Sequence, residues 1–142
     1  MQKILVPVDG SENALRALSY ALKLAEENRA IGLHLLTVHQ EPIIYGEIQV
    51  YVSREKMEEL QRNHSMDILQ PAVDAAKAAG VSYTSEILVG DTASMIVKRA
   101  DELNCDGIVM GTRGMSAVGN LVMGSVATKV VHLTKLPVTL IK

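Results

Sequence analysis

The sequence predicts a single α/β domain in which five parallel strands form a doubly wound sheet with helices on both faces. Short apolar runs alternate along the chain with longer segments of helical periodicity, and most of these runs end in turn residues. Such alternation requires a parallel sheet, because each right-handed crossover lays its helix against the sheet. The 142 residues, 48% of them hydrophobic, suffice for one core and are too few for two ordinary domains, so we expect one domain over residues 1–142.

The first third of the chain predicts two buried strands separated by a helix. Residues 4–6 are apolar and are followed by a Pro-Val-Asp-Gly turn, which is typical of a short parallel strand. Ser11 is a good N-cap, and apolar residues recur after it at spacings of three and four, so we expect an amphipathic helix over residues 11–30. Residues 33–38 form the second strand.

The middle of the chain combines an irregular segment with a long helix. Residues 41–52 show no sustained helical period yet are rich in apolar and aromatic side chains, so we expect a segment that is mobile or contacts a partner or a second copy. Residues 53–79 predict a long helix whose apolar stripe includes Leu60. Gly80 should end this helix and Pro71 should kink it.

The last third predicts three strands and two helices. In chain order they are an alternating strand at 81–89, a helix capped by Asp91, a strand at 107–110, a glycine-rich segment from Gly111 to Gly124, a helix at 125–133 and a strand at 137–141. In doubly wound sheets, ligands bind beyond the carboxyl ends of the strands. The segments that follow the strands are therefore the places to look for a site.

Composition argues against several classes of protein. A formal net charge of -2 with 21% charged residues disfavours both disorder and a non-specific grip on nucleic acid. Four tyrosines with no Phe or Trp leave few side chains for stacking on bases. Pro7 and Asp9 interrupt the first apolar run, so it is neither a secretory signal nor a membrane span. Because Cys105 is the single cysteine, no internal disulfide is possible, and we expect a cytoplasmic protein.

The glycine-rich segment is the candidate phosphate site. It reads Gly111-Thr112-Arg113-Gly114, nine further residues, then Gly124-Ser125-Val126 at a helix start. Glycines let backbone N–H groups approach an oxyanion, a serine hydroxyl can donate, and a helix N-terminus adds partial positive charge. The segment is neither a Walker A loop nor a G-x-G-x-x-G fingerprint. Spacing alone leaves open that the glycines only permit turns and that Ser125 only caps the helix.

At this point the sequence resembles the universal stress protein family. The G-T-R-G, nine residues, G-S pattern preceded by I-V-M is similar to the ATP-binding signature of that family. The runs I-L-V-P-V-D-G-S, L-L-T-V-H and L-P-V-T-L-I also fall where the family has them. The resemblance implies a strand order of 3-2-1-4-5, which places Asp9 beside the Gly111 loop, and it implies ATP as the ligand of a protein that acts in the stress response.

The resemblance also implies which residues contact the nucleotide. Pro7, Val8 and Asp9 would border adenine and ribose, and backbone groups of Val38 would read the adenine edge. The remaining implied positions face the ribose or wrap the phosphates, and in chain order they are Met110, Gly111, Thr112, Arg113, Gly114, Gly124, Ser125 and Val126.

Asp9 also has a rationale of its own. A carboxylate at a strand end can accept hydrogen bonds from ribose hydroxyls or attract the Mg²⁺ that accompanies ATP. Asp-Gly is equally a common turn dipeptide, so the residues alone leave a turn role open. Arg113 can supply positive charge to the phosphates if its side chain points inward.

The other chemically interesting side chains carry less weight. The histidines lack metal-site spacing and a carboxylate pair, so we expect surface or boundary positions for His34, His39, His64 and His132. Met123 would lie at the mouth of the pocket. Cys105 would be a structural thiol, since nothing basic beside it in the sequence lowers its pKa.

Three functions remain open from the sequence. The first is a regulator in which ATP orders the segment between Gly114 and Gly124, and a partner protein such as a transporter or an enzyme senses occupancy. The second is a weak ATPase or nucleotidyl transferase that uses Asp9 and Arg113, although no evident base, H-x-G-H or S-G-G-x-D-S signature is present. The third is an interaction module without ligand, against which the intact glycine signature argues.

The last strand predicts self-association. Val138, Leu140 and Ile141 are apolar, and the resemblance places their strand at a sheet edge. An unpaired apolar edge is a liability unless another chain or its own loops cover it. We therefore expect a homo-oligomer, a dimer or larger, formed through this strand.

Overall fold

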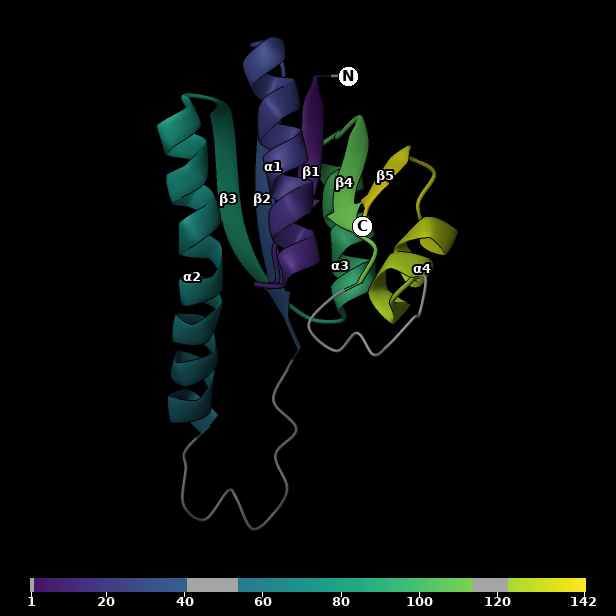
Figure 1. Cartoon of the computed structure of the whole chain (residues 1–142). Coiled ribbons are helices and arrows are strands. Elements are labelled where there is room, and N and C mark those ends of the chain that lie inside the picture. Colours follow the sequence, from purple (N-terminus) through teal and green to yellow (C-terminus); the bar gives the residue numbers. More distant parts are fainter. Residues whose placement is uncertain (1, 41–53, 114–122) are drawn as a thin grey trace.

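Five parallel strands lie side by side in the order β3-β2-β1-β4-β5 (Figure 1). The computed structural model describes residues 2–40, 54–113 and 123–142. Its elements are β1 (Lys3–Pro7), α1 (Glu12–Glu27), β2 (Gly32–His39), α2 (Arg54–Ala79), β3 (Ser82–Val89), α3 (Thr92–Glu102), β4 (Gly107–Gly111), α4 (Ser125–Leu133) and β5 (Val138–Ile141). This architecture confirms the predicted doubly wound sheet and its strand order.

The sheet separates two apolar cores, because successive side chains of a strand point to opposite faces. On one face α1 and α2 pack against β1 through Ile4 and Val6. On the other face α3 and α4 pack against Leu5 of β1 and Ile108 of β4. Helices therefore cover both faces, as a parallel sheet requires.

The turns around α1 explain its exact length. The Ser11 hydroxyl accepts from the Ala14 N–H at 3.1 Å and caps the start of the helix, as predicted. The helix ends at Glu27 rather than near residue 30, because Asn28 leaves the helical region and its side chain accepts from the Ala30 N–H at 3.1 Å. The short turn that follows feeds directly into β2.

The long helix α2 packs against the sheet with only part of its length. Its buried residues begin at Ser65, whereas Leu60, predicted to lie on the apolar stripe, is 54% exposed. Figure 1 shows the first turns of α2 extending beyond the end of the sheet, where no strand lies beneath them. The helix runs on through Pro71 without interruption, and Gly80 follows it with a φ of +68°, the left-handed conformation typical of a helix end.

Segments far apart in sequence join at the start of β4. The Asp106 carboxylate accepts from the N–H groups of Gln2 and Lys3 at 2.7 and 2.9 Å, which ties β4 to β1. These hydrogen bonds lower the pKa of Asp106. Residues 41–52 and Gly114, for which the sequence predicts contacts, lie outside the described ranges. No helix in those ranges is long and apolar enough to cross a membrane.

Candidate nucleotide site

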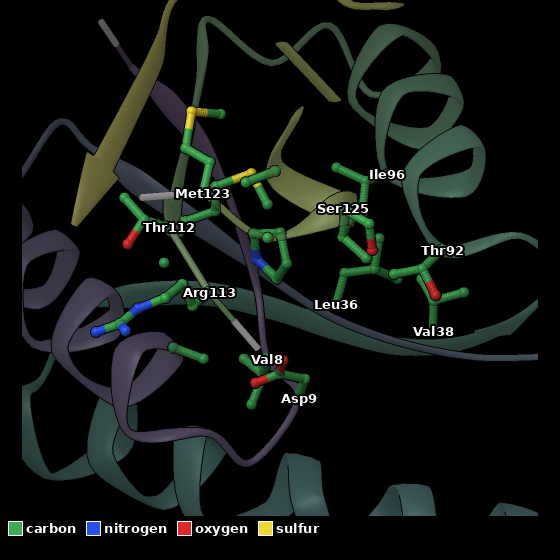
Figure 2. A pocket seen from close by; sticks show the side chains of 17 residues that line it. Val8, Asp9, Leu36, Val38, Thr92, Ile96, Thr112, Arg113, Met123 and Ser125 are labelled. Atoms are coloured by element: carbon green, nitrogen blue, oxygen red, sulfur yellow. The ribbon is translucent and has the colours of Figure 1, made fainter. Parts of the chain in front are cut away.

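A cavity of about 440 Å³ opens at the carboxyl ends of β1, β2 and β4 (Figure 2). From β1 the chain winds outward to β3 and then returns to the other side of β1 as β4, so the cavity lies at the topological switch point. All predicted site residues that the structure describes line it. They are Pro7, Val8, Asp9, Val38, Met110, Gly111, Thr112, Arg113, Gly124, Ser125 and Val126.

The sequence analysis missed several lining residues and gave only a minor place to Met123, which also lines the cavity. Those it missed are Ala14, Leu36, Thr92, Ile96 and Ala127. Most of them are apolar residues at the starts of helices or on the inner strands. Leu36 had a usable signal, because it lies two residues before Val38 and so faces the same side of the sheet. The others reach the cavity only through the packing of α1, α3 and α4 on the sheet.

The lining of the cavity includes Val38, whose peptide N–H and carbonyl face the β1 side beyond the end of the β1–β2 pairing. The Leu36 carbonyl accepts from the Val8 N–H at 2.8 Å, and peptide groups of alternate residues in a strand point the same way, so those of Val38 also point toward the β1 side. The pairing between β1 and β2 stops at Pro7 and Leu36. Beyond it the Val8 carbonyl accepts from the Thr37 hydroxyl at 2.9 Å.

A second polar part of the lining is the start of α4. A side chain caps α1 and another caps α3, but Gly124, the N-cap of α4, has no side chain to offer. Among the described residues, no side chain caps the first N–H groups of α4. Ser125 and Val126 of this first turn line the cavity, so a partial positive charge and several donors lie in its wall.

Asp9 sits in the turn between β1 and α1. One of its carboxylate oxygens accepts from both the N–H and the hydroxyl of Ser11, at 2.9 and 2.6 Å. Gly10, with a φ of +84°, makes the turn possible. Asp9 therefore has the turn role that the dipeptide suggested, and it also lines the cavity with an exposed side chain.

Arg113 and Thr92 lie on different sides of the cavity. Figure 2 shows the Arg113 guanidinium extending away from Ser125 and Ile96. Leu36, Val38 and Thr92 gather on the other side in the same view. Thr92 follows Gly90, whose N–H donates to the His39 carbonyl at 2.9 Å and so holds the start of α3 at the end of β2.

An ion pair links the two helices that form one wall. Asp91 accepts from Lys129 of α4 at 2.9 Å and from the N–H and hydroxyl of Ser94 in α3, at 3.1 and 2.7 Å. The hydrogen bond from Lys129 is the largest cause of the lowering of the Asp91 pKa to about 2, followed by those from Ser94. Asp91 thus fixes the start of α3 and its distance from α4 at the same time.

The residues of the cavity fit a bound Mg²⁺ only as a companion of phosphates. Asp9 is the one carboxylate among the described lining residues, and no group of three or more metal-ligating side chains occurs in the described ranges. Mg²⁺ in phosphate sites commonly takes one or two carboxylates and completes its shell with phosphate oxygens and water. Asp9 alone can serve that limited role.

His34 corrects the expectation of surface or boundary histidines. Its side chain is buried on the α3 face of the sheet, with Nδ1 2.6 Å from the Thr84 hydroxyl and Nε2 2.9 Å from Glu86. Arg99 of α3 donates to the same Glu86 oxygen. Burial opposes ionisation of Glu86, but the hydrogen bonds from Arg99 and His34 outweigh it and lower the Glu86 pKa. These partners come from β3 and α3, two elements other than the strand of His34, so no local sequence pattern could reveal them.

Cys105 is buried in the core on the α3 face, and burial raises the pKa of its thiol. This agrees with a structural role. The positive charges of Lys3 and Arg99 oppose the shift without reversing it.

The fold and the cavity together define a doubly wound α/β protein with a cavity at its switch point. The chain belongs to the universal stress protein family, whose model matches residues 1–142. Universal stress protein YxiE of Bacillus subtilis is 32% identical over 146 residues, which cover 99% of this chain and 98% of the relative. Universal stress protein MJ0531 of Methanocaldococcus jannaschii is 31% identical over 141 residues, 99% of this chain and 82% of the relative.

Solved structures of similar proteins share the fold along nearly the whole chain. The hypothetical protein MJ0577 superposes with a TM-score of 0.86 at 27% identity, covering 99% of this chain and 95% of that one. The universal stress protein of Archaeoglobus fulgidus was solved in complex with dAMP, and it superposes with a TM-score of 0.67 at 27% identity, covering 100% and 98%.

Proposed function

We propose that this protein binds an adenine nucleotide, with ATP as the principal ligand, in the cavity at the carboxyl ends of β1, β2 and β4. The observation that carries the proposal is the combination of groups that line one cavity: the peptide groups of Val38 beyond the β1–β2 pairing, the start of α4 with no side-chain cap among the described residues, and apolar side chains. Its 440 Å³ fall within the range of small-ligand sites.

The base would lie at the Val38 end. Adenine presents an amino donor beside a ring-nitrogen acceptor, a pair that matches one carbonyl and one N–H of a free peptide edge. Leu36, Ile96 and Met110 supply the apolar surface on which a flat ring can rest. Thr92 adds a hydroxyl beside this surface.

The ribose and phosphates would follow toward α4. Ser11 donates to only one carboxylate oxygen of Asp9, Oδ1. The second oxygen can accept from ribose hydroxyls or approach a Mg²⁺ carried by the phosphates. The first turn of α4 supplies N–H donors and its dipole to the phosphates, with Gly124 leaving room for close approach. The binding of an adenine nucleotide is also supported by the Archaeoglobus fulgidus relative, which was solved with dAMP, and by a further relative at 28% identity, which was solved with cAMP.

Binding without rapid chemistry is the role that this site supports best. Hydrolysis needs a group that positions and activates water. Among the described lining residues Asp9 is the one carboxylate, and Ser11 already engages one of its oxygens. We therefore propose an occupancy signal that a partner protein reads, within a cytoplasmic stress response, rather than a weak ATPase or a nucleotidyl transferase.

Native mass spectrometry of freshly purified protein tests the proposal. We expect a co-purifying or added adenine nucleotide at one per chain, with ATP persisting on incubation. Conversion of the bound mass to ADP within minutes would favour the ATPase instead. No binding of ATP, ADP or AMP at millimolar concentration would contradict nucleotide binding.

A further inference from the structure

Asn13, in the first turn of α1, is a buried polar residue that the proposed nucleotide contacts do not include. Its relative exposure is 7%, and its Nδ2 donates to the hydroxyl of Thr112 at 3.2 Å across a separation of 99 residues. Thr112 is itself buried, 5% exposed, and lines the cavity at the start of the glycine-rich segment. The bond therefore joins the turn after β1 to the segment after β4.

The orientation of the Asn13 amide is determined by its second partner. Arg16, one turn further along α1, donates to the Asn13 carbonyl oxygen. An arginine can only donate, so the oxygen of the amide must face it and the amino group must face Thr112. Arg16 also donates to the Lys142 carbonyl at 2.7 Å, which anchors it to the end of the chain.

The backbone of Thr112 links the end of β4 to β5 and to the start of α4. Its N–H donates to the Ile141 carbonyl of β5 at 2.9 Å, and its carbonyl accepts from the Gly124 N–H at 2.6 Å. Gly124 is the N-cap of α4. Thr112 therefore has two links: its side chain accepts from Asn13, and its backbone accepts from the residue at the start of α4, the helix proposed to bind phosphates.

Close packing leaves this junction little freedom. A Cβ placed on Gly111 would come within 2.7 Å of the Asn13 Cβ, so β4 approaches α1 as closely as a glycine permits. A small shift of Asn13 would therefore be transmitted directly to residues 111 and 112.

We propose that Asn13 is a positioning residue for phosphate binding: through Thr112 it sets the position of Gly124 and of the donors in the first turn of α4. This inference rests on the proposed nucleotide function. Asn13 is not among the residues that line the cavity, and its hydrogen bond leads through Thr112 to the start of α4, so its loss should weaken phosphate binding more than nucleoside binding.

Calorimetric titration with two probes, ATP and adenosine, tests the proposal. Wild type should bind both, ATP more tightly. Asn13→Ala should lower the affinity for ATP about tenfold, because it removes one hydrogen bond that fixes the geometry of the donors. The affinity for adenosine should stay within about twofold of wild type. Thr112→Val removes the other partner with little change of shape and should also weaken ATP; because Thr112 lines the cavity itself, the affinity for adenosine is compared only in Asn13→Ala.

The double variant and a remote control complete the design. Asn13→Ala with Thr112→Val should lose no more ATP affinity than either change alone, because both remove one interaction. Asn28→Ala removes an asparagine hydrogen bond at the opposite end of α1, and it should leave both affinities unchanged. Circular dichroism confirms folding, and if Asn13→Ala does not fold, Thr112→Val still decides.

Three results would overturn the proposal in distinguishable ways. Equal weakening of ATP and adenosine would assign Asn13 a general structural role, and unchanged ATP binding in both variants would show that the bond positions nothing. Absence of binding of either probe by wild type would contradict the proposed function itself, and this inference with it.

Discussion

Gly111 and Gly124 bracket the glycine-rich segment, and the structure gives them different reasons to be glycine. A side chain on Gly111 would collide with Asn13 of α1. Gly124 has a φ of -76°, which any residue adopts, so its backbone conformation does not require glycine. In the proposed complex, glycine at this position leaves space for a phosphate.

Substitution at these two glycines should therefore separate folding from binding. We expect Gly111→Ala to lower the free energy of unfolding by about 1–3 kcal/mol through overpacking. Gly124→Val should fold normally and lose ATP binding. Urea denaturation and calorimetric titration measure the two effects, and wild-type ATP affinity in folded Gly124→Val would show that the phosphates lie elsewhere.

Asp9→Asn distinguishes a metal contact from a ribose contact. The change keeps the shape and removes the charge, so it should weaken Mg²⁺-ATP more than metal-free ATP if the carboxylate approaches the metal. Titration with and without Mg²⁺ measures the difference. An equal loss in both would assign Asp9 to the ribose, and no loss in either would leave it the turn role alone. Ser125→Ala, which removes one hydroxyl donor, serves as the comparison: its affinity for ATP should fall about five- to a hundredfold.

At the scale of elements, Asp91 ties α3 to α4 beside the cavity. Its pKa falls from the ordinary 3.8 to about 2 in the folded protein. A carboxyl group with a lowered folded pKa stabilises the fold above its unfolded pKa, and that contribution is lost as the pH falls through the folded value. The loss should therefore occur between about pH 4 and pH 2.

Asp91→Asn should remove this pH dependence of the free energy of unfolding between about pH 4 and pH 2. Chemical denaturation at a series of pH values from 6 to 2 would measure it, with Asp74→Asn, on the far helix α2, as the matched control. We expect the variant to be less stable than wild type at pH 6 and the two to converge toward pH 2. A constant difference across the range would show that the Asp91 charge contributes nothing to stability.

Elements were predictable from sequence where local signals decide them. Ser11 and Asp91 cap their helices as expected, and Ser125 to Leu133 is helical as expected. The sequence misplaced features that depend on tertiary contacts. Leu60 fits a helical stripe but lies beyond the sheet, and His34 is buried because Glu86 and Arg99 arrive from other elements.

For the candidate site, motif and resemblance located the residues at the ends of the strands and at the start of α4, but not all of the apolar wall. Val38 lies near the end of β2, Asp9 follows β1 and Gly124 precedes α4, positions that a sequence pattern marks. Ile96 and Ala127 reach the cavity from the inward faces of α3 and α4, and only the docking of these helices brings them there. The roles of all these residues in binding stay predictions.

At the scale of the whole molecule, the described sheet ends at β5 with one edge unpaired. Ile141 accepts from Thr112 on the β4 side, so the alternate peptide groups, those of Leu140, point outward. The side chains of Val138 and Leu140 already pack against the core, which leaves the backbone edge as the available surface. We propose that a second copy pairs with it.

Sedimentation velocity tests this oligomer. Wild type should sediment as a dimer or larger at tens of micromolar, and Leu140→Pro, which removes the outward N–H, should shift the population toward monomer. Val131→Ser, on the exposed surface of α4, should leave the association unchanged if the strand edge carries it. A monomeric wild type would contradict the prediction.

The central claim is that one adenine nucleotide lies with its base at Val38 and its phosphates at the start of α4. The most direct measurement is a titration of ¹⁵N-labelled protein with ATP, followed by the chemical shifts of the backbone amides. We predict saturable shifts that are largest at Val38, Gly124, Ser125 and Val126, with those of β3 and α2 nearly unchanged. Saturable shifts centred on β3 and α2, or no shifts at millimolar ATP, would contradict the account.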